Sequence, residues 1–312
     1  MFHFMEKNFS YMIKNILIIG SGSIAQNHLK NLKKINKNFN YFLISSRKFN
    51  TLIKKDFRKI INFNPNYILI CSPSSYHYQH LDFIEKNFIK KIILIEKPIF
   101  SKFHKFSKKL KNKYFIGYNL RFHPVLKFLK KYLQNKKCYL VRVNCSSYLP
   151  HWRKKNYTKS VSAQKKLGGG VLLELSHELD YLLWVFRKIK ITNVLNKKIS
   201  NLKIDTDDVL ILNCITSKKT IINLTINFFS RIPSREIFID GQNFSIHANF
   251  LNNTIKINEQ KKKKIIKFKK FSISETYKLE NLSIINNKKS NICTFKEGLK
   301  LMNFIKEIRN HD

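Results

Sequence analysis

The chain has 312 residues, of which 43% are hydrophobic, so it is long enough for two domains with cores and too apolar for a disordered protein. Its formal net charge is +41, from 60 lysines and arginines against 19 acidic residues. The lysines are spread along the whole chain together with Asn, Ile and Phe, which also have A/T-rich codons. Mutational bias therefore explains the charge better than one concentrated basic face, and we expect no specific nucleic-acid partner.

The cysteines and the N-terminal residues indicate the compartment. The five cysteines include no Cys-x-x-Cys pair, so we expect reduced thiols, no metal site and a cytoplasmic protein. We find no apolar run long enough for a bilayer and no signal-peptide pattern at the start, so we expect no membrane partner. Met1 and Met12 are both candidate start residues, because Met12 lies just before the first predicted strand.

The first predicted strand, residues 16–19, runs directly into a glycine-rich turn and a helix. The pattern Gly-x-Gly-x-x-Ala in this context is typical of dinucleotide binding, because glycine permits the turn and the close approach of a pyrophosphate. The phosphates would bind the amides at the start of the helix. An ordinary strand–helix turn is the alternative. The residues predicted to contact the cofactor here are Gly20, Gly22, Ser23, Ile24 and Ala25.

The second predicted strand, residues 40–44, is followed by Ser46 and Arg47. An NAD-specific site usually has an acidic residue at this place, which accepts the ribose hydroxyl. A hydroxyl and a guanidinium instead suit the 2′-phosphate of NADP. The sequence therefore favours NADP over NAD, and the alternative is that Arg47 is one more exposed cation.

A third buried strand, residues 65–71, ends in a polar loop that contains Ser72, Pro73 and His77. Because parallel strands end at one edge of a sheet, this loop is expected beside the glycine turn. His77 either lines the cofactor pocket or simply begins the next predicted helix, residues 77–86.

The fourth strand, residues 92–96, is followed without a spacer by Glu96-Lys97-Pro98. Burial at the end of a strand disfavours the charged form of a lysine. Such a lysine can hold a substrate hydroxyl and stabilise the oxyanion that develops on it. A surface lysine at the end of a strand is the alternative for Lys97 taken alone.

In the second half, residues 139–145 alternate as a strand, and a polar loop follows through Lys166. We interpret this segment as a substrate loop, in which Trp152 packs on a sugar and Arg153 clamps a phosphate or carboxylate. A packed surface loop anchored by Trp152 is the alternative.

The pattern of residues 168–186 predicts a glycine-rich turn followed by a mostly buried helix. Glu174, His177 and Asp180 recur on it at three-residue spacing, so the polar face of the helix must meet a partner or a cleft. A structural histidine is the alternative for His177. A zinc site is rejected, because no second histidine stands at the required spacing.

From residue 204 on, the chain reads as successive strands. Three hairpins are predicted, from residues 209–214 and 220–228, 236–240 and 244–247, and 254–257 and 265–268. An antiparallel sheet of this kind needs one face covered by helices or by another subunit. An amphipathic helix, residues 293–309, ends the chain.

Taken in order, these motifs resemble the Gfo/Idh/MocA (glucose–fructose oxidoreductase/inositol dehydrogenase) family of NAD(P)-dependent sugar oxidoreductases. The resemblance covers most of the chain and rests on five short motifs in family order: Gly20-x-Gly22-x-x-Ala25, Ser72-Pro73 with His77, Glu96-Lys97-Pro98, Gly117 to Pro124 including Arg121, and Gly168-Gly-Gly170 leading to His177, Asp180 and Trp184.

The resemblance implies an α/β protein with an N-terminal Rossmann dinucleotide-binding domain and a C-terminal α/β domain. We place the first at residues 12–120 and the second at residues 121–312. The large, mostly antiparallel sheet of the second domain is expected to form the interface of a homo-oligomer.

The resemblance also implies roles for single residues. Lys97 matches the catalytic lysine, with a cis bond to Pro98, and Glu96 would position the cofactor ribose. His177 matches the acid/base histidine. Where the family usually has Asp four residues before this histidine, the chain has Glu174 three residues before it, and we assign Glu174 as the third catalytic residue, which relays protons or orients His177. We assign Arg121 and Asp180, together with Trp152 and Arg153, to substrate binding.

We therefore expect an enzyme that transfers hydride between NADP or NAD and a hydroxyl or keto group of a sugar, with amino and nucleotide sugars of surface glycans among the candidates. One alternative is a non-catalytic NAD(P)-binding regulator or sensor. The observation that favours it is that Glu174 differs in type and spacing from the usual Asp of the family. A charge-driven nucleic-acid-binding protein is the other.

Overall fold

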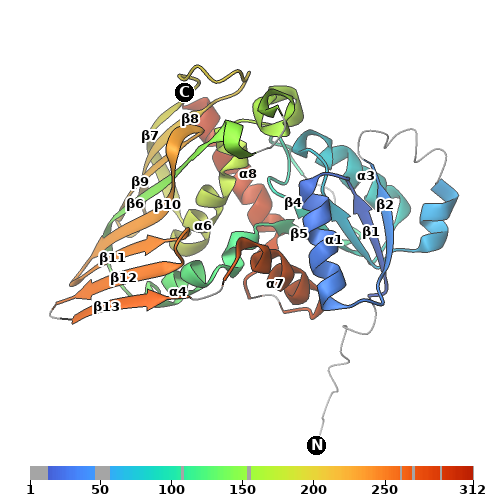
Figure 1. Cartoon of the computed structure of the whole chain (residues 1–312), viewed down its shortest axis with the longest axis horizontal. Helices are drawn as coiled ribbons and strands as arrows, with labels where there is room; N and C mark the ends of the chain where they lie inside the picture. The colour runs from blue at the N-terminus through green and yellow to red at the C-terminus, as the bar shows by residue number, and fades with distance from the viewer. Residues whose placement is uncertain are drawn as a thin grey trace, which may run out of the picture. The chain divides into compact units, whose positions relative to one another are not determined.

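The structure is a computed structural model that describes residues 13–45, 57–106, 109–152, 156–260, 262–268, 271–288 and 290–311. It divides into two compact units (Figure 1). The first unit runs to Ile99 and also includes Lys105–Asn119 and Ser272–Phe295, and the second comprises Phe100–His104, Leu120–Phe271 and Lys296–Asp312. The longest segment of the second unit begins at Leu120. The return of Ser272–Phe295 to the first unit was not predicted.

The first unit contains a sheet with the order β14-β5-β4-β3-β1-β2. Its strands are β1 (Asn15–Ile19), β2 (Asn40–Ile44), β3 (Tyr67–Ile70), β4 (Ile92–Glu96), β5 (Lys113–Gly117) and β14 (Cys293–Thr294). The first five are parallel, and β14 pairs antiparallel with β5. Strands β1 and β3 are almost wholly buried, which is why they read as continuous apolar runs. The predicted Rossmann sheet is confirmed.

The helices of this unit are α1 (Ser23–Ile35), a helical segment at 57–63, α3 (His77–Asn87) and α7 (Ile273–Ile285). Helix α1 leads from β1 to β2, and the chain then passes to β3 on the other side of β1. The strand order therefore reverses between β1 and β3, and such a switch point is where ligands bind in open α/β sheets. Helix α7 packs on α1.

The second unit contains a sheet with the order β13-β12-β11-β10-β6-β9-β8-β7. Its strands are β6 (Cys138–Tyr148), β7 (Ile189–Lys197), β8 (Val209–Thr216), β9 (Ile221–Asn227), β10 (Phe229–Gly241), β11 (Phe244–Asn249), β12 (Thr254–Glu259) and β13 (Lys262–Lys267). Strands β6 and β9 are parallel, and all other neighbours are antiparallel. The mostly antiparallel sheet and its three predicted hairpins are confirmed.

One face of this sheet is buried and the other is partly open. Val141, Val143 and Cys145 of β6 are buried, whereas Arg142 between them is exposed and Asn144 is half-buried. Four helices belong to this unit: α4 (Pro124–Tyr132), α5 (Val171–Glu174), α6 (Ser176–Phe186) and α8 (Phe295–Asn310). Figure 1 shows α4, α6 and α8 on one side of the sheet. No helix in the described ranges is both long and apolar enough for a membrane span.

A buried ion pair ties α6 to the short helical turn Asn119–Phe122. The guanidinium of Arg121 donates from Nε and Nη2 to both oxygens of Asp180, at 2.9 and 2.7 Å. The two residues are 2% and 3% exposed. A third bond, from Nη1 to Glu297 of α8 at 2.9 Å, ends on a carboxylate that is 40% exposed. Such a two-pronged contact fixes the direction of α6 as well as its distance.

Replacement of Asp180 by Leu should lower the free energy of unfolding by roughly 3–5 kcal/mol, because it leaves a buried guanidinium without its main partner. The matched control, Glu297→Gln, removes charge at the exposed end of the same arginine and should cost less than about 1 kcal/mol. Urea denaturation followed by circular dichroism measures both. Equal losses in the two variants would contradict the assignment of Asp180 as the structural partner.

Candidate active site

The glycine turn after β1 is held against the ends of its neighbouring strands. Gly20 has a φ of +131°, and a Cβ on it would lie 2.6 Å from the carbonyl oxygen of Cys71. Its amide donates to the carbonyl of Ile44 at 2.7 Å. A side chain is therefore excluded at Gly20 both by conformation and by space. The turn joins the carboxyl ends of β1, β2 and β3.

The next glycine, Gly22, has space for a side chain, whereas Gly20 has none. Gly22 is the residue before the first turn of α1, and nothing lies within 4 Å of a Cβ built on it. No side chain caps α1 at this residue, and Gly22 and Ser23 are exposed, while Ile24 is half-buried. Ala25 is fully buried in the packing of α1 on the sheet. This helix start therefore offers its amides and its partial positive charge to an anion such as a pyrophosphate.

The residues used to favour NADP, Ser46 and Arg47, lie outside the described residues. The preference between the two cofactors therefore stays a prediction from the sequence.

The loop after β3 is tied to the loop after β4 by His77. Its Nε2 lies 2.8 Å from the carbonyl oxygen of Ser72, and its Nδ1 lies 3.1 Å from the carbonyl oxygens of Pro98 and Ile99. His77 is fully buried, and burial lowers the pKa of its imidazole. The interpretation of His77 as the start of a helix is confirmed, because α3 begins there. With no exposed surface, its ring holds the two loops together, and its place in the lining of the cofactor pocket stays a prediction. Pro73 is half-buried between them.

The carboxylate of Glu96 points into the first unit. One oxygen, Oε1, lies 2.7 Å from Nε2 of His28, and the other, Oε2, accepts from the backbone amide of Lys97 at 3.2 Å. Glu96 is only 6% exposed, and Gly117 leaves room for it, since a Cβ there would lie 3.0 Å from Oε1. Both oxygens of Glu96 thus have partners within the first unit, and its role in positioning the cofactor ribose stays a prediction.

Lys97 is half-buried at the carboxyl end of β4. Its peptide bond to Pro98 is cis, as the resemblance predicts. Within the first unit, Lys97 thus follows a strand end at the same edge as Gly20 and Ser72. This edge brings together the predicted cofactor turn and the predicted catalytic lysine.

In the second unit, the predicted helix 168–186 is two helices with a break at Leu175. Glu174 ends α5 and is half-buried, whereas His177 lies in the first turn of α6 and is 9% exposed. The spacing argument that placed them on one helical face is therefore wrong. The fully buried carboxylate of Glu178, next to His177, pairs with Nε of Arg235 on β10 at 2.9 Å.

Three of the four residues assigned to substrate binding lie in the part of the chain that the structure describes. Arg121 and Asp180 are buried and paired with each other, and their assignment to substrate binding stays a prediction. Trp152 packs edge-on against the buried ring of Phe228 with centroids 5.2 Å apart, which supports the alternative of an anchoring tryptophan. Arg153 lies outside the described residues.

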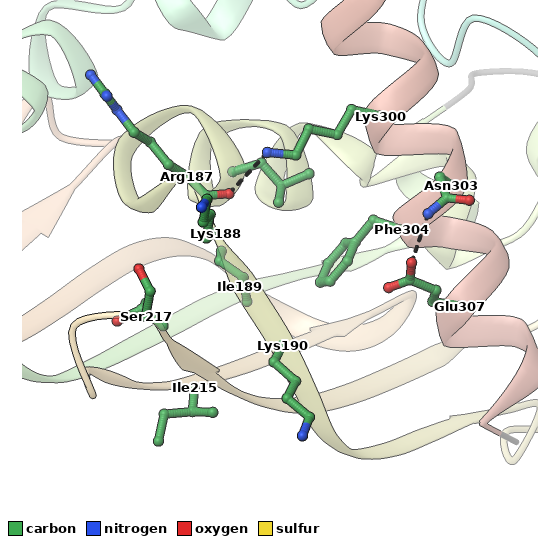
Figure 2. Close-up of a pocket in the computed structure, with 12 residues that line it drawn as sticks. Arg187, Lys188, Ile189, Lys190, Ile215, Ser217, Lys300, Asn303, Phe304 and Glu307 are labelled. Carbon is green, nitrogen blue, oxygen red and sulfur yellow. Dashed lines mark hydrogen bonds between the residues drawn. The ribbon is translucent and has the colours of Figure 1, made fainter.

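A cavity of about 420 Å³ lies in the second unit between the end of α6, strands β7 and β8, and α8. Figure 2 shows Lys300 directed at the carbonyl of Arg187, with 3.3 Å from Nζ to the oxygen, while the side chain of Arg187 points away. None of the predicted site residues lines this cavity, so it is not the site of the predicted chemistry. Across the described ranges, no three His, Cys, Asp or Glu side chains are grouped to hold a metal ion.

Two buried residues near the carboxylate of Glu96, His28 and Asn281, were not predicted. His28 follows Ala25 by three residues on α1, and this spacing places both on the inner face of the helix. That spacing was the available signal. For Asn281 of α7 no local signal existed, because the buried residues of α7 are mostly polar, with Thr276, Glu280 and Asn281 beside Ile284 and Ile285.

Part of the first unit matches a known protein family. Residues 14–112 match the family described as "Oxidoreductase family, NAD-binding Rossmann fold" (GFO_IDH_MocA). No curated protein sequence matches the chain.

Several solved structures share the fold of the whole chain. UDP-N-acetylglucosamine 3-dehydrogenase GnnA from Acidithiobacillus ferrooxidans is 15% identical, with a TM-score of 0.73 over 96% of this chain and 98% of that chain. Levoglucosan dehydrogenase in complex with NADH and levoglucosan is 14% identical, with a TM-score of 0.76 over 96% and 97%. The WlbA dehydrogenase from Bordetella pertussis in complex with NADH and UDP-GlcNAcA is 13% identical, with a TM-score of 0.72 over 96% of each chain.

At such identities the structural likeness establishes the fold, and the family match establishes the cofactor domain. Over residues 14–112 the chain carries the NAD-binding Rossmann domain of the Gfo/Idh/MocA oxidoreductase family, whose motifs its sequence resembles.

Proposed function

We propose that this protein is an NAD(P)-dependent oxidoreductase that transfers hydride between the nicotinamide and a hydroxyl or keto group of a sugar or nucleotide sugar. The observation that carries the proposal is the edge of the first sheet, where an open helix start and a strand-end lysine stand together. The solved relatives that were determined with NADH and levoglucosan, or with NADH and UDP-GlcNAcA, support the substrate class. We also propose that it acts in the cytoplasm as a homo-oligomer formed through the open face of the second sheet.

The bound cofactor would supply the hydride acceptor at its nicotinamide ring. Gly22 and the first amides of α1 would hold its pyrophosphate. Lys97 would bind the substrate oxygen through Nζ and stabilise the negative charge that grows on it as the C–H bond breaks. We assign the hydroxyl proton to the imidazole of His177, a role that rests on the family resemblance.

A regulator that binds the dinucleotide without chemistry is the second candidate, and the break between Glu174 and His177 is the observation that favours it. Assay of the purified protein with a panel of sugars and nucleotide sugars, with NADH and NADPH or their oxidised forms, distinguishes the two. Cofactor binding without turnover on any substrate would favour the regulator.

Replacement of Lys97 by Met should reduce kcat by roughly two to four orders of magnitude, because it removes acid–base and electrostatic help at the substrate oxygen. Cofactor affinity, followed by fluorescence titration, should stay near that of the wild type. The matched control is Lys33→Met on the exposed side of α1, which should keep full turnover. A Lys97→Met variant with near-normal turnover on the true substrate would exclude Lys97 as the catalytic lysine.

Replacement of Gly22 by Ala should raise the Kd for the cofactor about tenfold, because the new methyl group occupies the path of the pyrophosphate. The folded protein has space for this methyl group, so the melting temperature should stay close to that of the wild type. Gly20→Ala, by contrast, should lower the melting temperature, since its Cβ would meet the carbonyl of Cys71. Unchanged cofactor affinity in Gly22→Ala would argue against a phosphate site at this turn.

Replacement of Arg47 by Ala should lower kcat/KM for NADPH by roughly tenfold and leave the value for NADH nearly unchanged, because only the former loses a charge-assisted contact. Arg58→Ala, at an exposed position, serves as the control for general loss of positive charge. An equal loss of kcat/KM with both cofactors, or no loss with either, would contradict a 2′-phosphate contact at Arg47.

A further inference from the structure

A polar network lies in the interior of the first unit, between α1 and α7 and behind the end of β4. Its members are Tyr67, Asn281, His28 and Glu96, which are 0%, 0%, 0% and 6% exposed. The hydroxyl of Tyr67 donates to Oδ1 of Asn281 at 2.9 Å, and Nδ2 of Asn281 donates to the carbonyl of Tyr277 at 2.8 Å. The ring of Tyr277 meets His28 edge-on with centroids 5.2 Å apart. The proposed reaction gives no role to Tyr67, Asn281 or His28.

The bonds around Asn281 fix the direction of every bond that follows. The carbonyl of Tyr277 can only accept, so the group of Asn281 that meets it must be the donor Nδ2, and the same Nδ2 lies 3.0 Å from Nδ1 of His28. An amide nitrogen only donates, so Nδ1 of His28 accepts and the proton of the neutral ring is on Nε2. Nε2 then donates to Oε1 of Glu96 at 2.7 Å. The tautomer of His28 follows from the orientation of a single amide.

The last bond of the chain reaches the predicted catalytic residue. With Oε1 held by His28, the other oxygen of Glu96 is directed at the backbone amide of Lys97, which donates to it at 3.2 Å. His28 lies one turn beyond the cofactor-binding start of α1, at Ser23. The network thus joins the helix that would bind the cofactor, a helix from the far end of the chain and the turn that carries Lys97.

We propose that His28 is a positioning residue for Lys97, acting through the carboxylate of Glu96, and that Asn281 sets the imidazole tautomer on which this depends. The proposal rests on the proposed function, since it assumes that Lys97 contacts the substrate oxygen. The role of His28 is to donate one hydrogen bond. Shifts of about 1 Å in a supporting group cost roughly a hundredfold in rate, so a loss of this bond should be visible in kcat.

Two replacements of His28 separate the hydrogen bond from the packing. In His28→Gln the side-chain amide can still donate from about the place of Nε2, whereas His28→Leu fills the space and donates nothing. We expect roughly a ten- to hundredfold lower kcat for His28→Leu, a KM within about threefold of the wild type, and a kcat for His28→Gln within about threefold. The Kd for the cofactor and the melting temperature are measured on the same samples.

A second variant covers the case in which His28→Leu does not fold. Glu96→Gln keeps the size of the side chain, but its NH2 group must face one of two donors, Nε2 of His28 or the amide of Lys97. It should show the same selective loss of kcat. Tyr67→Phe, which removes only the outermost hydroxyl of the network, should show a smaller loss than either.

A readout without turnover separates this inference from the proposed function. Competitive acetylation of Lys97, followed by mass spectrometry across a pH series, measures how reactive its amine is. His28→Leu should shift the pH midpoint of labelling at Lys97, and His28→Gln should not. If the wild type turns over no sugar but this shift is present, the proposed function fails and the positioning role stands.

Two results would overturn the positioning role. One is a folded His28→Leu protein with wild-type kcat and wild-type labelling of Lys97. The other is an equal loss in His28→Gln and His28→Leu, which would mean that the shape of the imidazole matters and its bond to Glu96 does not.

Discussion

The approach of β1 to β3 is the constraint on which the candidate site depends. A Cβ at Gly20 would lie 2.6 Å from the carbonyl of Cys71, so the two strand ends are as close as main chains allow. This closeness brings the glycine turn to the loop after β3, and His77 then ties that loop to the residues after Lys97. Three loops from separate parts of the sequence are thereby fixed relative to one another, two by the close approach of their main chains and the third by the buried ring of His77.

The parts of the fold that could be predicted are those with a local pattern. Buried parallel strands give continuous apolar runs, the second sheet gives alternation, and the glycine turn gives a fixed spacing. Helix α7 has no such pattern, because three of the five residues that it buries, Thr276, Glu280 and Asn281, are polar. The pairing of Arg121 with Asp180 was missed for the opposite reason. Both residues were recognised, but a sequence does not show whether two opposite charges meet each other or a ligand.

Helix α6 shows how one short segment can serve packing and chemistry at once. Its first turn carries His177, while the next residue, Glu178, is fully buried and pairs with Arg235 of β10. Asp180, half a turn further, is held by Arg121. With two buried carboxylates pinned to different elements, the helix has little freedom to rotate or slide, so the direction of His177 within the second unit is set by charge pairs as well as by apolar packing.

The interior of the first unit raises the question of why it holds a hydrogen-bonded network where apolar side chains would fit. Each buried polar group costs desolvation, and replacing a paired polar cluster with apolar groups of the same size is often neutral or stabilising. Stability alone therefore gives no reason to keep His28, Asn281 and Tyr67 together. What an apolar core cannot do is orient a carboxylate, because it supplies no donor. Glu96 has to lie beneath the turn at Lys97 with one oxygen directed at the amide of that residue, and it holds that direction only if a donor of fixed tautomer meets the other oxygen. The polar interior is thus best explained by the geometry it imposes at the strand end.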